Sequence, residues 1–519
     1  MTEEFALHPG QLGLADLRRV AAGSIERLAI DQEAWAAVDA ARALIEQIVA
    51  EGRRVYGVNT GFGPLSSVAI PPADVAEMQR RMIVSHCVGV GPALPDAVVR
   101  QVILLKLNTL LQGRSGVGRD LIRALHGLFN AGALPVIPSK GSVGASGDLA
   151  PLAHLAAAII GVGSVQLDGQ ELPATEALER AGIRLVTLGP KEGLAMVNGT
   201  QVSLALALQG LFAIENVFAA AVLAGALSTD AAMASDGPFD PRIHASRGQR
   251  GQERLARVYA SLLAGSEIRD SHRDCDRVQD PYSLRCQPQV MGASLDLLVF
   301  AASILANEIN AVTDNPLVFA EDDEILYGGN FHGQPIAMAA DIIALAAAEV
   351  GSMSERRIAL LVDTGFSRLP PFLAVDPGLD SGFMVAQVAA ASLASENKSI
   401  AHPASIDSIP TAANQEDIVS MATYAARRLT EMADNAAAIV AIELLAAAQG
   451  IEFRRPRRTS PVLEEVLAEI RAVVPPSTGD RYMKPDIDAI KALVESGRLT
   501  RFVPSDVLLS FSESPVSPR

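Results

Sequence analysis

Five long stretches rich in alanine and leucine constrain the fold of this chain more than any other feature. They cover residues 202–228, 292–311, 334–362, 382–399 and 417–449. Each has the length and composition of a helix with little polar surface, so several such helices must bury one another. Aromatic residues make up only 4% of the chain, which also favours helices, because strands prefer aromatic and branched side chains. We therefore expect a mainly α-helical fold.

The first 200 residues have a different character. Short helical patterns at 34–50 and 96–112 alternate there with loops rich in glycine and proline. We expect an N-terminal domain at 1–200, followed at 201–519 by a long-helix bundle and a C-terminal helical region. The helix faces are more apolar than one chain needs, so we also expect the chains to associate.

Charge and composition argue against several classes of protein. A net charge of −16 disfavours nucleic acid as a partner, since phosphate binding needs a basic face. The run 204–227 is interrupted by polar side chains, which favours a buried helix over a membrane span. The N-terminus shows no secretion signal, and the histidines lack the paired spacing of a metal site. We expect a cytoplasmic protein without metal, with reduced thiols at Cys87, Cys275 and Cys286.

The most informative segment for chemistry is residues 139–154, Ser-Lys-Gly-Ser-Val-Gly-Ala-Ser-Gly-Asp-Leu-Ala-Pro-Leu-Ala-His. One interpretation is an ordinary loop that leads into a helix capped by Asp148. A phosphate-binding loop is a poorer match, because the segment lacks the Gly-Lys-Ser/Thr ending. A third interpretation is cyclisation of the backbone, in which the Gly147 nitrogen attacks the Ala145 carbonyl carbon. Loss of water from the ring and from Ser146 would then leave a methylidene electrophile.

Other motifs decide between these interpretations. They occur, in order, at 56–63 (Tyr-Gly-Val-Asn-Thr-Gly-Phe-Gly), 191–201, 279–286, 313–317 and 328–332. Together with the glycine-rich segment they resemble the aromatic amino acid ammonia-lyase family over almost the entire chain. The resemblance implies a 4-methylidene-imidazol-5-one group (MIO) formed from Ala145, Ser146 and Gly147, with no external cofactor. It also implies a fumarase/aspartase-like helical fold, with the MIO in the N-terminal domain, and a homotetramer whose active sites are assembled from several chains.

The resemblance assigns roles to further residues. Tyr56 would remove the β-proton of the substrate, and its glycine-rich loop would close over the site. Arg285 would hold the substrate carboxylate in a bidentate pair. Asn198 would hydrogen-bond near the MIO carbonyl. The remaining assignments are Tyr282 in MIO formation or proton transfer, Gln279 in orienting its neighbours, and Phe331 in lining the ring pocket.

Two segments suggest which amino acid is the substrate. Ser85 with His86, and Asn-Gln-Glu-Asp at 414–417, resemble the histidine-specific branch of the family, which implies elimination of ammonia from L-histidine to give trans-urocanate. The chemistry agrees, because His86 and Glu416 can satisfy both ring nitrogens of an imidazole, whereas a phenyl ring would leave the carboxylate without a partner.

Two other positions keep an alternative open. Gln334 and Ile418 resemble instead the lyases and 2,3-aminomutases of the family that act on tyrosine. An MIO-dependent lyase or 2,3-aminomutase acting on tyrosine or another aromatic amino acid is therefore the second hypothesis. A non-catalytic helical scaffold is disfavoured, because the Ala-Ser-Gly, tyrosine and arginine motifs are all intact.

Overall fold

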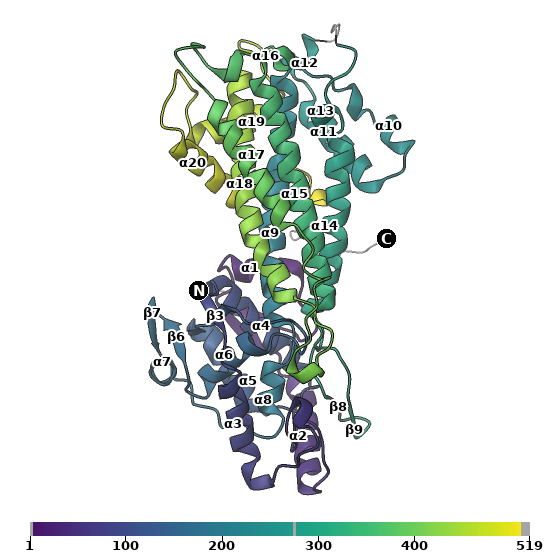
Figure 1. Ribbon diagram of the computed structural model, residues 1–519, viewed down its shortest axis with the longest axis vertical. Coiled ribbons are helices and arrows are strands. Elements are labelled where there is room, and N and C mark those ends of the chain that lie inside the picture. Colours follow the sequence, from purple (N-terminus) through teal and green to yellow (C-terminus); the bar gives the residue numbers. More distant parts are fainter. Residues whose placement is uncertain (1–3, 273–276, 510–519) are drawn as a thin grey trace.

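A computed structural model describes residues 4–272 and 277–509 (Figure 1). Long helices run side by side through the upper part of the molecule in Figure 1, and most of the first 200 residues surround their lower end. The predicted mainly helical class is confirmed. The long-helix bundle consists of α9 (Gln201–Ala231), α11 (Arg250–Leu263), α14 (Gln287–Ile309), α15 (Gln334–Val362), α17 (Met384–Ile400) and α18 (Ala422–Glu452).

All five predicted stretches form helices of this bundle, and one local difference, at the start of α18, affects the candidate site. The apolar pattern predicts helix from residue 417, but α18 begins at Ala422. The residues before it bond to the glycine-rich loop instead. The Met421 backbone N–H donates to the Val143 carbonyl over 2.8 Å, and the Ser420 hydroxyl donates to the Gly144 carbonyl over 2.8 Å. These contacts replace the first helical turn and bring the segment at 416 to the candidate site.

A buried ionic network connects three helices of the bundle. Arg357 on α15 pairs with Glu443 on α18, with 2.5 Å between Nε and Oε1, and both side chains are inaccessible to solvent. Ser228 on α9 also donates to Glu443 over 2.7 Å. Buried charges are tolerated when they are paired and hydrogen-bonded in this way.

Among the helices of the described residues, four (α9, α14, α15 and α18) are long and apolar enough to cross a membrane, by length and composition alone. Protein covers 94% of the apolar window of α9, and two polar residues in the middle of this helix have partners within the chain. Glu215 pairs with Arg18 over 2.5 Å, and Asn216 donates to the Glu495 carbonyl over 3.0 Å. The predicted buried helix is confirmed for α9. Protein covers only 44% of the window of α14, which leaves apolar side chains such as Phe300 exposed.

The N-terminal part combines short helices with small sheets. Its helices are α1 (Leu14–Ala21), α2 (Ala34–Ala50), α3 (Val75–His86), α4 (Asp96–Leu111), α5 (Arg119–Ala131), α6 (Leu149–Ile159), α7 (Ala174–Arg180) and α8 (Glu192–Val197). In the sheets, β1 (Glu4–Leu7) pairs with β2 (Arg27–Ile30) in parallel, β3 (Val90–Ala93) with β5 (Pro138–Lys140) antiparallel, and β6 (Ser164–Leu167) antiparallel with both β4 (Leu134–Pro135) and β7 (Gln170–Pro173). Helix α4 of this part packs on α9 of the bundle, so the two parts are in contact. The division into two domains at residue 200 stays a prediction.

The remaining elements connect or flank the bundle. They are α10 (Pro241–Ala245), α12 (Glu267–Asp270), α13 (Tyr282–Arg285), α16 (Thr364–Ser367), α19 (Pro461–Val473), α20 (Lys484–Glu495), and the antiparallel pair β8 (Leu317–Phe319) and β9 (Glu324–Leu326). Short 3-10 turns lie at Gly63–Leu65, Pro72–Asp74, Gly237–Phe239, Pro371–Leu373, Ala412–Asn414, Arg498–Phe502 and Ser505–Val507. In Figure 1, α10, α12 and α13 lie at the upper end of the bundle, whereas α6 and α8 lie at its lower end.

Candidate active site

The Ala145-Ser146-Gly147 tripeptide precedes α6, and its last residue lies against the junction between α8 and α9. Gly147 has φ +77°, and a Cβ atom at this position would lie 2.2 Å from the carbonyl oxygen of Gly199. The next residue is fixed to the same carbonyl, because the Asp148 N–H donates to Gly199 O over 2.7 Å. Only glycine therefore fits at position 147 without displacing the backbone of the α8–α9 junction.

The Asp148 side chain joins three segments of the chain below the tripeptide. It is fully buried and accepts at Oδ2 from the Ser203 N–H (2.7 Å) and hydroxyl (3.0 Å). Its Oδ1 accepts from the hydroxyls of Thr423 (2.7 Å) and Ser142 (3.1 Å). Burial raises the pKa of Asp148, and these hydrogen bonds oppose the rise. Asp148 occupies the N-cap position of α6, as one interpretation of the sequence expects, but its side chain makes no capping hydrogen bond.

Ser146 is contacted by two of the predicted site residues. Its hydroxyl donates to Glu416 Oε1 over 2.5 Å, and its carbonyl oxygen accepts from Asn198 Nδ2 over 3.2 Å. The other carboxylate oxygen of Glu416 accepts from the Thr411 hydroxyl over 2.6 Å. Thr411 and Glu416 also pair through their backbones as an isolated antiparallel bridge. Both oxygens of Glu416 are thus fixed, one of them at the tripeptide.

His86 ends α3 with one ring nitrogen already engaged. Its Nδ1 lies 2.8 Å from the Met82 carbonyl oxygen. A carbonyl can only accept, so Nδ1 carries the hydrogen, and Nε2 of the neutral ring is an acceptor. Tyr56 lies in the preceding loop, where its hydroxyl accepts from the Gly63 N–H over 3.3 Å. Its ring packs edge-on against Phe62, with 6.4 Å between centroids.

These side chains meet in one cavity of about 980 Å³. Its lining is mainly apolar, which is usual for a small-molecule site with a few polar groups that set orientation. Five predicted site residues line it: Tyr56, His86, Ser146, Asn198 and Glu416. Within residues 4–272 and 277–509, no group of three or more His, Cys, Asp or Glu side chains is placed to hold a metal ion.

Lys106 was not singled out from the sequence, although it lies next to this site. It is buried on α4, and its Nζ donates to the carbonyl oxygens of Ala195 (2.9 Å) and Asn198 (2.7 Å). Burial lowers its pKa to about 7, against the opposing attraction of Asp314. The signal in the sequence is a lysine within the otherwise apolar run Val-Ile-Leu-Leu-Lys-Leu at 102–107, since a buried charge must find partners.

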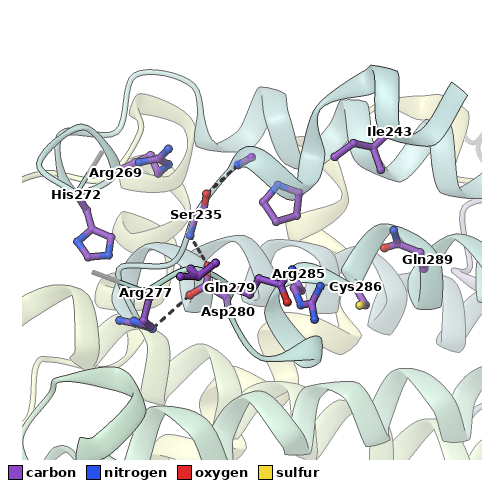
Figure 2. A pocket seen from close by; sticks show the side chains of 13 residues that line it. Ser235, Ile243, Arg269, His272, Arg277, Gln279, Asp280, Arg285, Cys286 and Gln289 are labelled. Carbon is purple, nitrogen blue, oxygen red and sulfur yellow. Dashed lines mark hydrogen bonds and ion pairs between the residues drawn. The ribbon is translucent and has the colours of Figure 1, made fainter. Parts of the chain in front are cut away.

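Another group of predicted residues lies at the opposite end of the bundle, on and around α13 (Figure 1). Gln279 and Arg285 line a separate cavity of about 440 Å³, together with Arg269 and Arg277, and Figure 2 shows them beside Ser235 and Asp280. Tyr282 is 70% exposed, and the Arg285 guanidinium lies 4.6 Å from the centroid of its ring. The chain therefore does not bring these residues to its own Ser146.

Three further positions from the sequence lie outside the large cavity. Phe331 is half-buried and lines neither cavity. Gln334 begins α15 and donates to the Ser405 carbonyl over 3.1 Å. Ile418 is 63% exposed in this chain, and its carbonyl oxygen lies 3.2 Å from His332 Nε2. Support for Glu416 comes from Thr411 rather than from the side chain at 418.

Two of the three cysteines lie within the described residues. Cys87 and Cys286 are free thiols, and Cys275 lies outside the described residues. Burial raises the pKa of Cys87 to about 11, which keeps this thiol protonated and poorly reactive near neutral pH.

The arrangement agrees with a family model. Residues 12–472 match the model of aromatic amino acid lyase. The chain belongs to the aromatic amino acid lyase family.

Individual proteins match nearly the whole chain. A histidine ammonia-lyase of Aromatoleum aromaticum is 57% identical over 511 residues, which span 98% of this chain and 96% of that protein. The structure of histidine ammonia-lyase from Trypanosoma cruzi is 38% identical, with a TM-score of 0.90, and the match covers 98% of this chain and 97% of that one. The tyrosine aminomutase of Streptomyces globisporus is 34% identical, with a TM-score of 0.90 and coverage of 96% and 98%.

Proposed function

We propose that this chain is an ammonia-lyase that eliminates ammonia from L-histidine and releases trans-urocanate. The observation that carries the proposal is the contact between Ser146 and Glu416, because it puts a carboxylate beside the tripeptide in a cavity that also contains His86. The 57% identity to a histidine ammonia-lyase along nearly the whole chain supports the same substrate.

The tripeptide fits an MIO group. Ring closure joins the Gly147 nitrogen to the Ala145 carbonyl carbon, and position 147 has no room for a side chain. The Ser146 carbonyl, which would become the ring carbonyl, already accepts a hydrogen bond from Asn198. When formed, the MIO supplies an electrophile that takes the substrate amine and makes it a better leaving group. Asn198 increases the polarity of that carbonyl, and Asp148 holds the loop in place.

His86 and Glu416 select an imidazole ring. Since Nδ1 of His86 is bonded to Met82, Nε2 faces a ligand either as an acceptor or, when the ring is protonated, as a donor. Glu416 accepts the N–H from the other side of the substrate ring. The imidazole of His86 and that of the substrate therefore share one extra proton, so that together they carry a single positive charge. A phenyl ring offers no donor, and Glu416 would lose a partner at a cost of about 1–3 kcal/mol.

Tyr56 is the proposed base, and Arg285 is the proposed partner of the substrate carboxylate. Tyr56 reaches the cavity from a glycine-rich loop, which allows the side chain to close over the substrate. Arg285 offers two parallel N–H donors to a carboxylate. Tyr282, Gln279 and Phe331 complete the proposed set, in proton transfer, orientation and ring packing respectively.

Because α6 and α13 lie at opposite ends of the molecule (Figure 1), we propose that one active site combines residues of several chains. A cytoplasmic homotetramer is the proposed assembly, with the N-terminal domain at 1–200 and the bundle at 201–519. The exposed apolar face of α14 supports association, since large apolar patches usually mark an interface.

Two measurements test the function. The intact mass of the purified protein should be lower than the sequence mass by two water molecules, and an active protein of unchanged mass would refute the MIO. Incubation with histidine, tyrosine and phenylalanine should produce the ultraviolet absorbance of urocanate only. Coumarate without urocanate would refute the histidine assignment.

A tyrosine lyase or 2,3-aminomutase remains the second candidate, because of Gln334, Ile418 and the similarity to tyrosine aminomutase. Neither side chain lines the cavity of this chain, which favours histidine. The test is a search for β-tyrosine among the products of the tyrosine incubation. Its formation at a rate above that of urocanate would establish the aminomutase.

A further inference from the structure

Lys106 is a buried charge that the proposed mechanism does not use. Its side chain is 1% exposed, and its Nζ hydrogen-bonds to the carbonyl oxygens of Ala195 and Asn198. These carbonyls lie at the C-terminal end of α8, where the helix itself provides no donors. The ammonium therefore satisfies the end of α8 from inside the protein, although it does not line the large cavity.

The peptide that Lys106 binds contacts the tripeptide in two ways. The Asn198 side chain donates to the Ser146 carbonyl oxygen over 3.2 Å. Gly199, the next residue, forms a parallel bridge with Gly147, and its carbonyl accepts the N–H of Asp148 over 2.7 Å. The Asn198 carbonyl belongs to the peptide plane that joins these two contacts. Rotation of that plane would disturb the polarisation of Ser146 and the support of Gly147 together.

The surroundings of Lys106 make its hydrogen bonds strong. The buried charges that act on it are Asp314 and Asp148, which favour the ammonium, and Lys191, which opposes it. Lys191 is itself paired with Asp314 over 2.7 Å. Hydrogen bonds to a charged donor are stronger than neutral ones, and more so where water is excluded. Both acceptors of Lys106 belong to one junction, so the position of the side chain and the position of the junction depend on each other.

We propose that Lys106 is a positioning residue that holds the Asn198–Gly199 peptide against the Ala145-Ser146-Gly147 tripeptide. The inference rests on the proposed function, because it concerns formation and use of the same electrophile. Lys106 acts through Asn198 and Gly199 and does not touch the substrate. Without its ammonium, the peptide turns, ring closure becomes slower, and the ring carbonyl loses part of its hydrogen bond.

The test compares three variants as full-length protein. Lys106→Met removes the charge while keeping most of the length of the side chain, and Lys106→Arg keeps a charged donor. The matched control is Gln101→Met, because Gln101 is buried on the same helix and donates to a backbone carbonyl, that of Leu17 over 2.9 Å, away from α8. Intact mass, kcat and KM for histidine, and the thermal midpoint are measured for each.

We expect Lys106→Met to contain chains that have not lost two waters, and to show a kcat lower by about tenfold to a hundredfold, the effect of losing charged hydrogen bonds. Its KM should change by less than about twofold, because substrate contacts remain. Lys106→Arg should recover most of the kcat. Gln101→Met should lower the thermal midpoint while keeping its kcat and full water loss.

Three outcomes overturn the proposal: full water loss with unchanged kcat in Lys106→Met, an equal loss of kcat in Gln101→Met, or no recovery by arginine. If Lys106→Met gives no folded protein, Lys106→Gln carries the same comparison, since its short neutral amide cannot serve both carbonyls. Wild-type protein whose intact mass equals the sequence mass, with no loss of water, would instead refute the proposed function itself. The two failures are thus distinguishable.

Discussion

The Thr411 hydroxyl offers a sensitive test of how Glu416 is held. Thr411 Oγ1 donates to Glu416 Oε2 over 2.6 Å, and the two backbones pair through an N–H to carbonyl bond of 2.9 Å from residue 411. Thr411→Val removes the hydroxyl but keeps the shape of the side chain and both backbone bonds. The substitution therefore frees one carboxylate oxygen without unfolding the loop.

The size of the effect follows from the charge and the exposure of this contact. A hydrogen bond to a charged acceptor contributes about 1.5–3 kcal/mol. Thr411 and Glu416 are both half-buried, so solvent replaces part of the lost bond and the lower end of this range applies. A loss of about 1.4 kcal/mol corresponds to a tenfold change. We expect kcat/KM for histidine to fall by about tenfold, because Glu416 then orients the imidazole less well.

The assay follows urocanate absorbance over a range of histidine concentrations. The control is Thr500→Val, which removes a hydroxyl bonded to the Gly497 carbonyl over 2.7 Å in the C-terminal region. The intact mass of both variants should be lower than their sequence mass by two water molecules, as in the wild type, since neither residue contacts the tripeptide backbone. The reasoning is refuted if Thr411→Val retains its full kcat/KM, or if Thr500→Val loses as much.

Further predictions address the ring, a buried acid and the assembly. Gly147→Ala should lose no water and show no activity, because its Cβ would overlap the Gly199 carbonyl; intact mass checks this. Burial raises the pKa of Asp230 to about 6, so this group makes the fold less stable as pH rises from about 4 to 6. Asp230→Asn should therefore raise the free energy of unfolding at pH 8 by up to about 3 kcal/mol, and by almost nothing at pH 4, in urea titrations. Phe300→Glu places a charge on the exposed face of α14, and sedimentation should then show smaller species.

The long helices could be predicted from sequence because their apolar patterns are long and few other structures accommodate them. The start of α18 could not, because its first predicted turn bonds to the glycine-rich loop through Ser420 and Met421. An apolar pattern reflects only neighbouring residues, so it cannot predict a hydrogen bond to a segment far away in the sequence. The same reason explains why the Asp148 side chain does not cap α6: it accepts hydrogen bonds from Ser203 and Thr423 instead.

The candidate site was predictable in its residues more than in its arrangement. Motifs pointed to Tyr56 and Arg285 equally, yet only the first lines a cavity with Ser146. Order along the sequence does not distinguish a contact within one chain from a contact between two. The role of Lys106 could not be predicted for another reason: it lies in no polar motif, and its partners are backbone carbonyls, which any sequence provides.

The separation of Ser146 from Arg285 has a genetic consequence under the proposed assembly. A chain damaged at Tyr56 still provides a sound α13 end, and a chain damaged at Arg285 still provides a sound tripeptide. When both are made in one cell, mixed oligomers contain some centres built from the two intact halves, and activity returns. Two alleles damaged at the same end cannot rescue each other. A growth assay that needs histidine as a nitrogen source would thus sort the mutations of this one gene into two complementation groups.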